Sequence, residues 1–488
     1  MPNTRSQSYL AFDFGAESGR AVLAHLQAGV LTIDEVHRFP NDPVDYGGSQ
    51  HWDVPRLWFE VRTALSALED TDVTGIGVDT WGVDYALLGE HGELLQNPYH
   101  YRDPRNVTAM RDVLQVMSKE EIYETTGIQM MPINTLNQLY AAKQRTPRLV
   151  DAAGRFVMIS DLFNYWLTGH IGCEFTNATT TQLINARSRT WATPLMERLG
   201  IPTTLAAPIM QPGSIIGGLL PGIAHDQALK GARVVACASH DTASAVAAIT
   251  ARGGTAFISS GTWSLVGIEV DDPVITPKAL HLNFSNEGGV GHTICLLKNV
   301  MGLWMLQGCR RSWADLGRKF AYGELMEAAG RESGFRHLVD PDEASFVCPR
   351  DMPDAIDRFC AKTGQPAPAA PGAYARAILD SLALKYRLVI RNLEGLTGRP
   401  INEIRVIGGG SKNRLLNQFT ADATGKRVLA GPAEATALGN IAVQMLATGA
   451  VSSLDDARAI IDRSFPADVF EPRDAFTEPC AHAFERRT

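Results

Sequence analysis

The stretch Ala238-Ser-His-Asp-Thr-Ala-Ser-Ala-Val246 marks a change from one residue pattern to another. Before it, the apolar run Ala232-Arg-Val-Val-Ala-Cys-Ala238 predicts a buried strand. After it, residues 242–250 predict a helix of small apolar residues. In open α/β sheets, ligands bind where such a strand meets its helix. Asp241 therefore has two interpretations: a carboxylate that accepts a proton from a bound hydroxyl, or a cap of the helix.

Length and composition indicate a large globular protein. The chain has 488 residues, too many for one ordinary core, so two large domains are expected. Its residues are 45% hydrophobic and 20% charged, as in soluble globular proteins. A net charge of −8 argues against a nucleic-acid-binding surface. Since the polar N-terminus lacks the apolar core of a signal peptide and no stretch is suited to span a bilayer, a cytoplasmic protein is expected.

The seven cysteines include no CxxC pair, so the sequence indicates neither a zinc site nor a disulfide framework. Cys348 and Cys360 form the only close pair. A bridge between them is one alternative, and two reduced thiols of a cytoplasmic protein are the other. The segment around them, 320–370, contains proline and charged residues and predicts an irregular insertion whose role the sequence leaves open.

The N-terminal region predicts an antiparallel meander whose first turn can bind phosphate. Strand patterns fill residues 9–39, and the first turn is Gly15-Ala-Glu-Ser-Gly19. Glycines let the backbone approach a ligand closely, and successive N–H groups can cradle a phosphate. Here Ser18 can donate a hydrogen bond, Arg20 can neutralise phosphate charge, and Asp13 is placed to hold Mg²⁺ through water. An ordinary hairpin turn is the alternative.

A polar and aromatic turn follows the next predicted strand. The strand covers residues 74–79 and leads into Thr80-Trp-Gly-Val-Asp84. In this turn Trp81 offers an apolar face to a sugar ring, Gly82 a backbone contact, and Asp84 an acceptor for a hydroxyl. Packing of Trp81 in the core is the alternative.

The hairpin pattern recurs in the second half of the chain. Strands are predicted at 254–259 and 263–269, joined by the turn Ser260-Gly-Thr262. A duplication with one phosphate hairpin in each half is more specific than either hairpin alone. Thr262 is the side chain expected on the phosphates.

Two further patterns follow this second hairpin. Apolar spacing over residues 296–307 predicts a helix that carries Asn299 and Gln307, polar positions that a solvated surface also explains. A strand at 403–407 precedes Gly408-Gly-Gly-Ser411, and such a strand–turn–helix unit can hold an adenosine.

Taken in order, these motifs resemble the sugar kinases of the FGGY family, within the actin/hexokinase/Hsp70-like ATPase superfamily, from residue 9 to about residue 446. The segments that carry the resemblance are HRFPN (37–41), IGVDTWGVD (76–84), TNATTTQ (176–182), ASHDTASAV (238–246), SSGTWSL (259–265), LKNVMGLW (297–304), VIGGG (406–410) and GPAEA (431–435). The resemblance implies an α/β fold of two actin-like (ribonuclease H-like) domains with a catalytic cleft between them. It divides the chain into an N-terminal domain, 1–249, and a C-terminal domain, 250–488.

The resemblance also implies roles for individual residues. Asp241 matches the general base of the family, and Asp13 is the candidate for the metal. The matched sugar contacts are Gly82, His240, Asp241, Thr242 and Asn299. The matched ATP contacts are Ala16, Glu17, Ser18, Gly19, Arg20, Thr262, Gln307 and Gly409. Glu17 departs from the serine of some members, and a carboxylate beside a triphosphate is unfavourable unless it faces Mg²⁺ or the sugar.

The activity that the resemblance implies is transfer of the γ-phosphate of ATP, with Mg²⁺ as cofactor, to the 1-hydroxyl of L-rhamnulose in L-rhamnose catabolism. The protein is expected to be a monomer or homodimer that binds neither nucleic acid nor membrane. One alternative is a kinase for another ketose or polyol, such as xylulose, fuculose or glycerol. The other is an actin-like or chaperone-like ATPase that needs no sugar.

Overall fold

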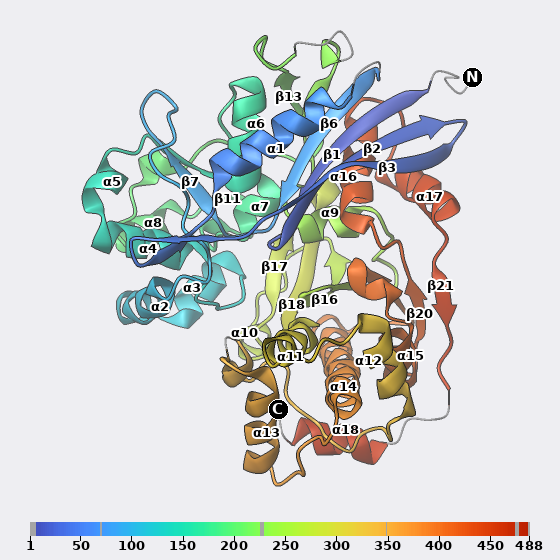
Figure 1. Cartoon of the computed structure of the whole chain (residues 1–488). Coiled ribbons are helices and arrows are strands. Elements are labelled where there is room, and N and C mark those ends of the chain that lie inside the picture. Colours follow the sequence, from blue (N-terminus) through green and yellow to red (C-terminus); the bar gives the residue numbers. More distant parts are fainter. Residues whose placement is uncertain (1–5, 69–70, 225–228, 348, 474–477, 487–488) are drawn as a thin grey trace. The chain divides into compact units, whose positions relative to one another are not determined.

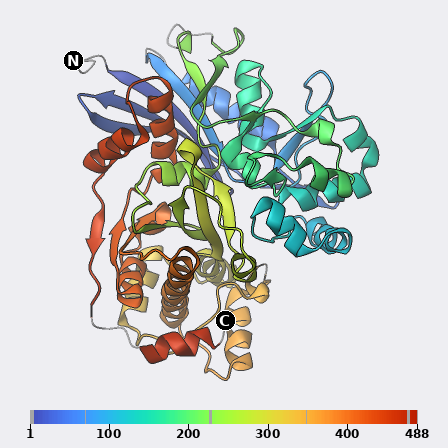
Figure 2. The same ribbon diagram turned by 180° about the vertical axis from the view of Figure 1, so that it is seen from behind.

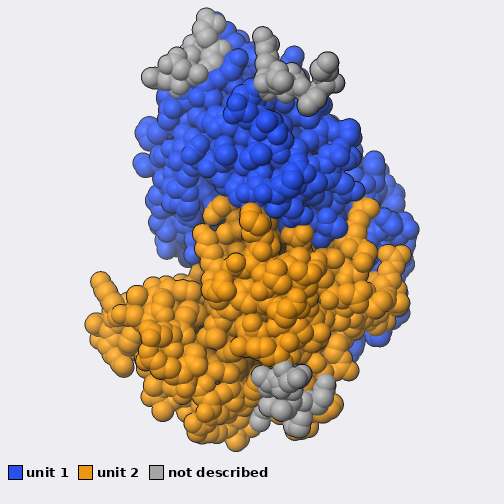
Figure 3. Space-filling model, turned by 90° about the vertical axis from the view of Figure 1, so that its right-hand side faces the viewer, with its two compact units in different colours: residues 1–250, 269–296, 435–465 blue, residues 251–268, 297–434, 466–488 orange. Residues whose placement is uncertain are grey.

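The structure, a computed structural model, describes residues 6–68, 71–224, 229–347, 349–473 and 478–486. The chain divides into two compact units (Figure 3). Unit 1 contains residues 1–250, 269–296 and 435–465, and unit 2 contains residues 251–268, 297–434 and 466–488. Cys348 of the possible disulfide lies outside the described residues, and Cys360 is buried.

Unit 1 is built on a six-stranded sheet whose N-terminal half is the predicted meander. Strands β1, β2 and β3 pair antiparallel in sequence order, while β1, β6 and β14 pair parallel. The sheet order is β13 (Ser214–Gly218), β14 (Arg233–Ala236), β6 (Val73–Thr80), β1 (Gln7–Phe14), β2 (Ser18–Gln27) and β3 (Val30–Pro40). Seven of the eight β1 residues are buried, which explains its nearly continuous apolar sequence, because a central strand is covered on both faces.

Helices and short strands complete unit 1. The helices are α1 (Val54–Ser66), α2 (Arg105–Val116), α3 (Lys119–Thr126), α4 (Thr135–Arg145), α5 (Pro147–Asp151), α6 (Ile159–Thr168), α7 (Phe175–Thr179), α8 (Thr193–Arg198), α9 (Asp241–Ala247), α10 (Pro277–His281), α16 (Ala435–Ala447) and α17 (Leu454–Ser464). The short strands are β4 (Val44–Tyr46), β5 (Ser49–His51), β7 (Tyr85–Leu88), β8 (Arg155–Met158), β9 (Cys173–Glu174), β10 (Ile184–Asn185), β11 (Thr190–Trp191), β12 (Ile209–Met210) and β17 (Ser285–Gly288).

Neither compact unit is continuous in sequence. Segments 269–296 and 435–465 belong to unit 1, although they lie beyond residue 249, where the sequence predicts the N-terminal domain to end. Both ribbon views show α16 and α17, in red, beside the blue N-terminal strands (Figures 1 and 2). The physical reason is close packing and hydrogen bonding: Gln444 Nε2 of α16 donates to the Leu10 carbonyl of β1 at 3.0 Å.

Unit 2 has its own sheet, with the second hairpin next to a parallel pair. The strand order of this seven-stranded sheet is β17 (Ser285–Gly288), β18 (Ile294–Met301), β16 (Trp263–Val270), β15 (Thr255–Ser260), β19 (Glu403–Ile407), β20 (Arg427–Ala430) and β21 (Asp468–Phe470), of which β17 belongs to unit 1. The division between the units falls inside β16 and β18. The helices are α11 (Trp304–Asp315), α12 (Tyr322–Arg331), α13 (Met352–Lys362), α14 (Pro371–Thr397), α15 (Arg414–Thr424) and α18 (Glu478–Glu485), and α14 packs against both α12 and α15.

Two local predictions need correction. The helix predicted over residues 296–307 is wrong: strand β18 ends at Met301, and α11 begins at Trp304. Burial on both faces of β18 produces apolar residues whose spacing imitates a helix. The predicted irregular insertion 320–370 contains the regular helices α12 and α13. Among the described residues, no helix combines the length and apolar character needed to cross a membrane.

Candidate active site

The junction between β14 and α9 lies against the carboxyl end of β6. The Thr80 N–H donates to the Ser239 carbonyl at 2.9 Å, which continues the parallel pairing past the end of β14. Helix α9 begins at Asp241, with His240 at the N-cap position and no capping hydrogen bond from its side chain. Asp241 is therefore the first helical residue rather than the cap, and its Oδ1 accepts from the Thr242 hydroxyl at 3.1 Å. About one third of the Asp241 side chain is exposed.

Three carboxyl groups of unit 1 interact electrostatically near this junction. Burial and the negative charge of Asp13 raise the pKa of Asp241 to about 7. Burial and Asp13 also raise the pKa of Asp79, which lies opposite Asp13 in the parallel register of β1 and β6. Arg20 donates to Asp13 Oδ2 through Nε at 2.9 Å and Nη2 at 2.6 Å. The Arg20 guanidinium thus pairs with Asp13, and its charge also acts on Asp79.

The donor set at these carboxyl groups fits a hard divalent cation. Asp79 Oδ2 accepts from Asn440 Nδ2 at 2.6 Å, but buried Asp79 Oδ1 has no hydrogen-bond partner among the described residues. Within that same part of the chain, no three His, Cys, Asp or Glu side chains converge into a complete metal cage. Mg²⁺ needs none, because it is usually held by one or two carboxylates together with water and substrate phosphates.

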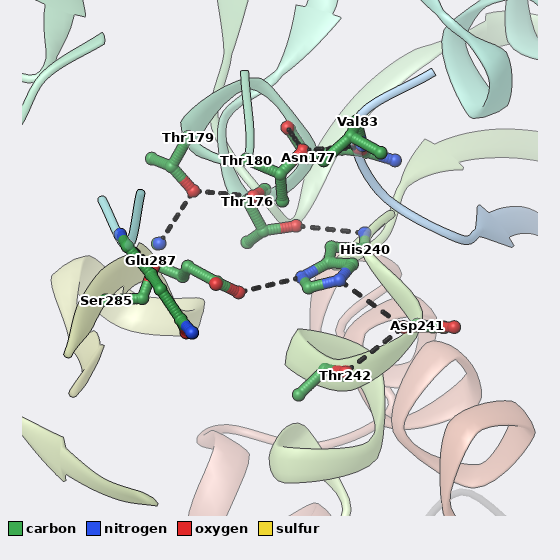
Figure 4. A network of polar contacts seen from close by, with 12 residues as sticks. Val83, Thr176, Asn177, Thr179, Thr180, His240, Asp241, Thr242, Ser285 and Glu287 are labelled. Atoms are coloured by element: carbon green, nitrogen blue, oxygen red, sulfur yellow. Dashed lines mark hydrogen bonds and ion pairs between the residues drawn. The ribbon is translucent and has the colours of Figure 1, made fainter. Parts of the chain in front are cut away.

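His240 lies between two acidic side chains (Figure 4). Its Nε2 is 3.4 Å from Asp241 Oδ1, and its Nδ1 is 3.3 Å from Glu287 Oε2. Burial lowers the pKa of His240 and raises the pKa of Glu287. The backbone N–H of His240 donates to Thr176 Oγ1 at 3.2 Å, which fixes the main chain at this point. The imidazole thus lies between two acidic groups, and its burial disfavours the charged form of the ring.

The predicted sugar contact Gly82 packs directly on this imidazole. A Cβ atom on Gly82 would lie 3.2 Å from His240 Nε2 and 3.0 Å from Thr180 Cγ2, so even a methyl group there would have to displace these neighbours slightly. Val83 follows with φ +67°, a strained value for a β-branched residue. Its N–H donates to Thr180 Oγ1 at 2.9 Å, and its carbonyl accepts from Thr135 Oγ1 at 2.6 Å. These bonds hold the loop in its strained form.

Asp84 and Trp81 form a buried scaffold beneath the loop. Asp84 Oδ2 accepts from the indole N–H groups of Trp52 at 2.5 Å and Trp81 at 2.9 Å, and Oδ1 accepts from Gln138 Nε2 at 2.8 Å. Burial raises the pKa of Asp84 to about 7. Because Trp81 is only 5% exposed and its indole nitrogen is engaged, the structure favours the core-packing alternative for this residue.

The first predicted phosphate turn is a tight link between β1 and β2. The Gly15 N–H donates to the Ser18 carbonyl at 3.0 Å, and Asn41 ties the turn to the end of β3 through the Gly15 and Glu17 carbonyls. Gly19 is needed because a Cβ there would lie 2.3 Å from the Phe39 ring. The backbone is thus fixed over the whole predicted set of Ala16, Glu17, Ser18, Gly19 and Arg20, of which Glu17 is exposed.

Unit 2 brings two of its predicted residues together. Thr262 lies at the turn between β15 and β16, and its hydroxyl is 3.5 Å from Oε1 of Gln307 in the first turn of α11. Asn299 lies on β18, and not on the predicted common helix with Gln307.

The three glycines of the turn 408–410 in unit 2 have different surroundings. A Cβ on Gly410 would lie 2.0 Å from Ser260 Oγ, and Gly408 has φ +78° beside the Ser260 carbonyl. By contrast, a Cβ on Gly409, the predicted ATP contact, would meet no atom within 4 Å. The two outer glycines therefore seat the turn on β15, and the middle one faces open space.

A cavity of about 620 Å³ adjoins this turn within unit 2. It is lined by residues of α12, the turn after the glycine triplet, α15 and β21, including Tyr322, Met326, Asn413, Arg414 and Phe470. Asn413 Nδ2 donates to the Tyr322 hydroxyl at 2.8 Å. The volume is in the range of small-molecule sites. Tyr322 lies in the segment that the sequence predicted to be irregular, so its part in this cavity was missed.

Several groups around His240 were not predicted from the sequence. Thr176 and Thr180 come from the small polar stretch after β9, and Glu287 comes from β17 in a glycine-rich stretch. The sequence offered one signal for Glu287, a charged residue within a stretch of small residues. That signal does not indicate that its partner is His240.

Comparisons with known proteins place the whole chain among related sequences. The model of the FGGY family of carbohydrate kinases, N-terminal domain, matches residues 8–248, and the C-terminal domain model matches residues 256–448. The rhamnulokinase of Bacteroides thetaiotaomicron is 42% identical over 471 residues, covering 96% of each chain. The rhamnulokinase of Bacillus subtilis is 37% identical over 98% of each chain.

Solved structures share the fold at low sequence identity. The gluconate kinase from Lactobacillus acidophilus superposes with a TM-score of 0.81 at 18% identity, over 99% of this chain and 96% of that one. The Plasmodium falciparum glycerol kinase with ADP superposes with a TM-score of 0.76 at 15% identity, over 99% and 96% of the two chains. The two-domain, actin-like α/β architecture predicted from the sequence is therefore confirmed.

Proposed function

Because this chain belongs to the FGGY family of carbohydrate kinases, we propose that it transfers the γ-phosphate of ATP to the 1-hydroxyl of L-rhamnulose. The products are L-rhamnulose 1-phosphate and ADP. Relatives named rhamnulokinase, 37–42% identical over nearly the full chain, support this choice of acceptor. The observation on which the chemistry rests is Asp241, a partly exposed carboxylate at a strand–helix junction with a pKa of about 7.

In this proposal Asp241 is the general base. Because its pKa lies near neutral pH, a large fraction of Asp241 is ionised, and the ionised carboxylate still accepts a proton readily. Asp241 orients the acceptor hydroxyl and takes its proton as the bond to phosphorus forms. Phosphoryl transfer proceeds mainly through positioning and neutralisation of charge, so one correctly placed base suffices. Gly82, His240 and Thr242 are the neighbours on the acceptor side, with Asn299 as a further sugar contact.

The remaining predicted residues bind the nucleotide. In unit 1, the phosphate contacts come from residues 16–20, with the Ser18 hydroxyl as a donor, because the Gly15 N–H is already bonded to the Ser18 carbonyl. In unit 2, Thr262, Gln307 and Gly409 contact ATP, and the neighbouring cavity takes the adenosine. Asp13 would hold Mg²⁺, which neutralises phosphate charge when bound. Removal of divalent cations should abolish turnover, and restoring Mg²⁺ should recover it. Since ATP is a cytoplasmic metabolite, we place the enzyme in the cytoplasm.

Asp241→Asn tests the base directly. The variant should lose about 10²- to 10⁴-fold in kcat, with the affinity for MgATP unchanged in calorimetry. Asp112→Asn, an exposed position on α2, is the matched control and should retain wild-type turnover. Near-normal turnover of Asp241→Asn would refute the assignment.

A panel of acceptors tests the substrate. ADP release is followed with L-rhamnulose, D-xylulose, L-fuculose, glycerol and no acceptor. L-rhamnulose should give the highest kcat/KM. Turnover with another acceptor alone would replace the proposed substrate, and ATP hydrolysis that is indifferent to acceptors would favour the non-sugar ATPase alternative.

A further inference from the structure

Glu287 is a buried acidic residue to which the proposed chemistry gives no task. It lies on β17, and its side chain is only 7% exposed. Its Oε2 faces His240 Nδ1 at 3.3 Å, and among the described residues neither atom has a hydrogen-bond partner. Figure 4 shows the carboxylate directed at the imidazole, with Ser285 beside it on the same strand. The two atoms thus face each other across 3.3 Å.

A carboxylate at this position decides which nitrogen of the imidazole carries the proton. A neutral imidazole has one N–H donor and one acceptor nitrogen, and the partner of one nitrogen fixes the role of the other. An ionised Glu287 favours the hydrogen on Nδ1, the nitrogen that its carboxylate faces. Nε2 then presents a lone pair, and it lies 3.4 Å from Asp241 Oδ1 and against Gly82. His240 Nε2 and Asp241 Oδ1 would then be two neighbouring hydrogen-bond acceptors at the start of α9.

We propose that Glu287 is a positioning residue that holds His240 in the Nδ1–H form, so that Nε2 accepts a hydrogen bond from a second hydroxyl of the substrate. This inference rests on the proposed function and deepens it: the preferred acceptor carries a second hydroxyl next to the one that Asp241 deprotonates. Burial of His240, which lowers its pKa, supports the neutral ring that this arrangement needs. Without the carboxylate, the ring would take the Nε2–H form common in water and donate to Asp241 instead.

The first test reads the tautomer directly in the ligand-free protein. Long-range ¹H–¹⁵N correlation spectra of histidine-labelled protein distinguish the two ring nitrogens, and His240→Asn identifies the His240 signals among the 12 histidines. The wild type should show a protonated Nδ1 and an unprotonated Nε2. Glu287→Met, which keeps the volume of the side chain but not its carboxylate, should shift His240 toward the Nε2–H form. A wild-type spectrum with Nε2–H would overturn the proposal.

The second test is a kinetic cycle. Glu287→Met should raise KM for the best sugar acceptor by about 10-fold or more, the value of one hydrogen bond to a buried group, and leave KM for MgATP unchanged. In the His240→Asn background, Glu287→Met should cause no further loss, because its effect passes through the imidazole. Independent, multiplicative losses would contradict this mechanism.

Two further variants separate positioning from stability. Glu269→Met removes another buried glutamate of unit 1, one that pairs with Arg458 at 2.9 Å, and should lower the melting temperature without changing KM for the sugar. If Glu287→Met does not fold, Glu287→Gln gives the same readouts with a smaller change of shape. The spectra need no substrate, so a protein that phosphorylates no sugar would refute the proposed function, while its spectra would still identify the tautomer of His240.

Discussion

The buried carboxyl group of Asp84 should make the stability of unit 1 depend on pH. Asp84 is 0% exposed, and burial raises its pKa from 3.8 to about 7 against the opposing hydrogen bonds from Gln138, Trp52 and Trp81. The folded state therefore binds the proton more tightly than the unfolded chain. The stability that protonated Asp84 contributes is fully present below pH 4 and is lost as the pH rises through 7.

The size of this effect follows from the shift. The folded-state pKa lies about three pH units above the ordinary value, and each unit corresponds to about 1.4 kcal/mol. Ionised Asp84 should therefore cost about 4 kcal/mol of unfolding free energy at pH 8 relative to pH 4. The amide of Asp84→Asn cannot ionise, so the variant lacks this pH dependence. Any other effect of the substitution on the free energy of unfolding is the same at every pH.

The assay is urea unfolding of the wild type and Asp84→Asn, followed by tryptophan fluorescence at several pH values between 4 and 8. The observable is the difference between the two proteins, because all other titrating groups are common to both. This difference should change by about 4 kcal/mol in favour of the variant as the pH rises. If the two stability curves run parallel across this range, the carboxyl group is not desolvated as described, and the reasoning fails.

Two glycine substitutions test the packing around the site. Gly82→Ala places a methyl group 3.2 Å from His240 Nε2, so KM for the sugar should rise about 10-fold while ATP binding is kept; Gly218→Ala, with open space at the new Cβ, is the control and should match the wild type in the same assay. Gly439→Ala on α16 would set a Cβ 1.6 Å from the Ser244 carbonyl of α9, and it should cost about 3 kcal/mol or more in urea unfolding. An unchanged unfolding midpoint would show that α16 and α9 can move apart freely.

Local patterns were sufficient to predict where the site's turns and junctions lie. The turn 15–19, the junction at Asp241 and the triplet 408–410 each join elements of the expected type, because glycines and abrupt changes of periodicity are local signals. The prediction of a helix at 296–307 was wrong because it also relied on a local pattern alone. A strand buried on both faces has no period of its own, and its apolar residues fit a helical spacing by coincidence.

Contacts between distant segments could not be predicted. Asp79 and Asn440 are 361 residues apart in sequence, and no property of either strand or helix indicates that they meet. Glu287 likewise reaches His240 only because segment 269–296 belongs to unit 1. A single sequence gives residue types and local periods, whereas these pairs depend on how the finished elements pack.

The return of α16 and α17 to unit 1 has a consequence for the order in which the protein is made. Unit 2 is inserted in the sequence between parts of unit 1, so a ribosome has released almost all of unit 2 before Ala435–Ala447 emerges. Until then, the Leu10 carbonyl has no hydrogen bond from Gln444, and Asp79 has none from Asn440. The surface of α9 on which Gly439 packs is also uncovered. A nascent chain that ends near residue 250 is therefore an incomplete unit 1, with an apolar face open to chaperones. The acceptor side of the site takes its final form only when the last part of the chain, from α16 onward, is being synthesised.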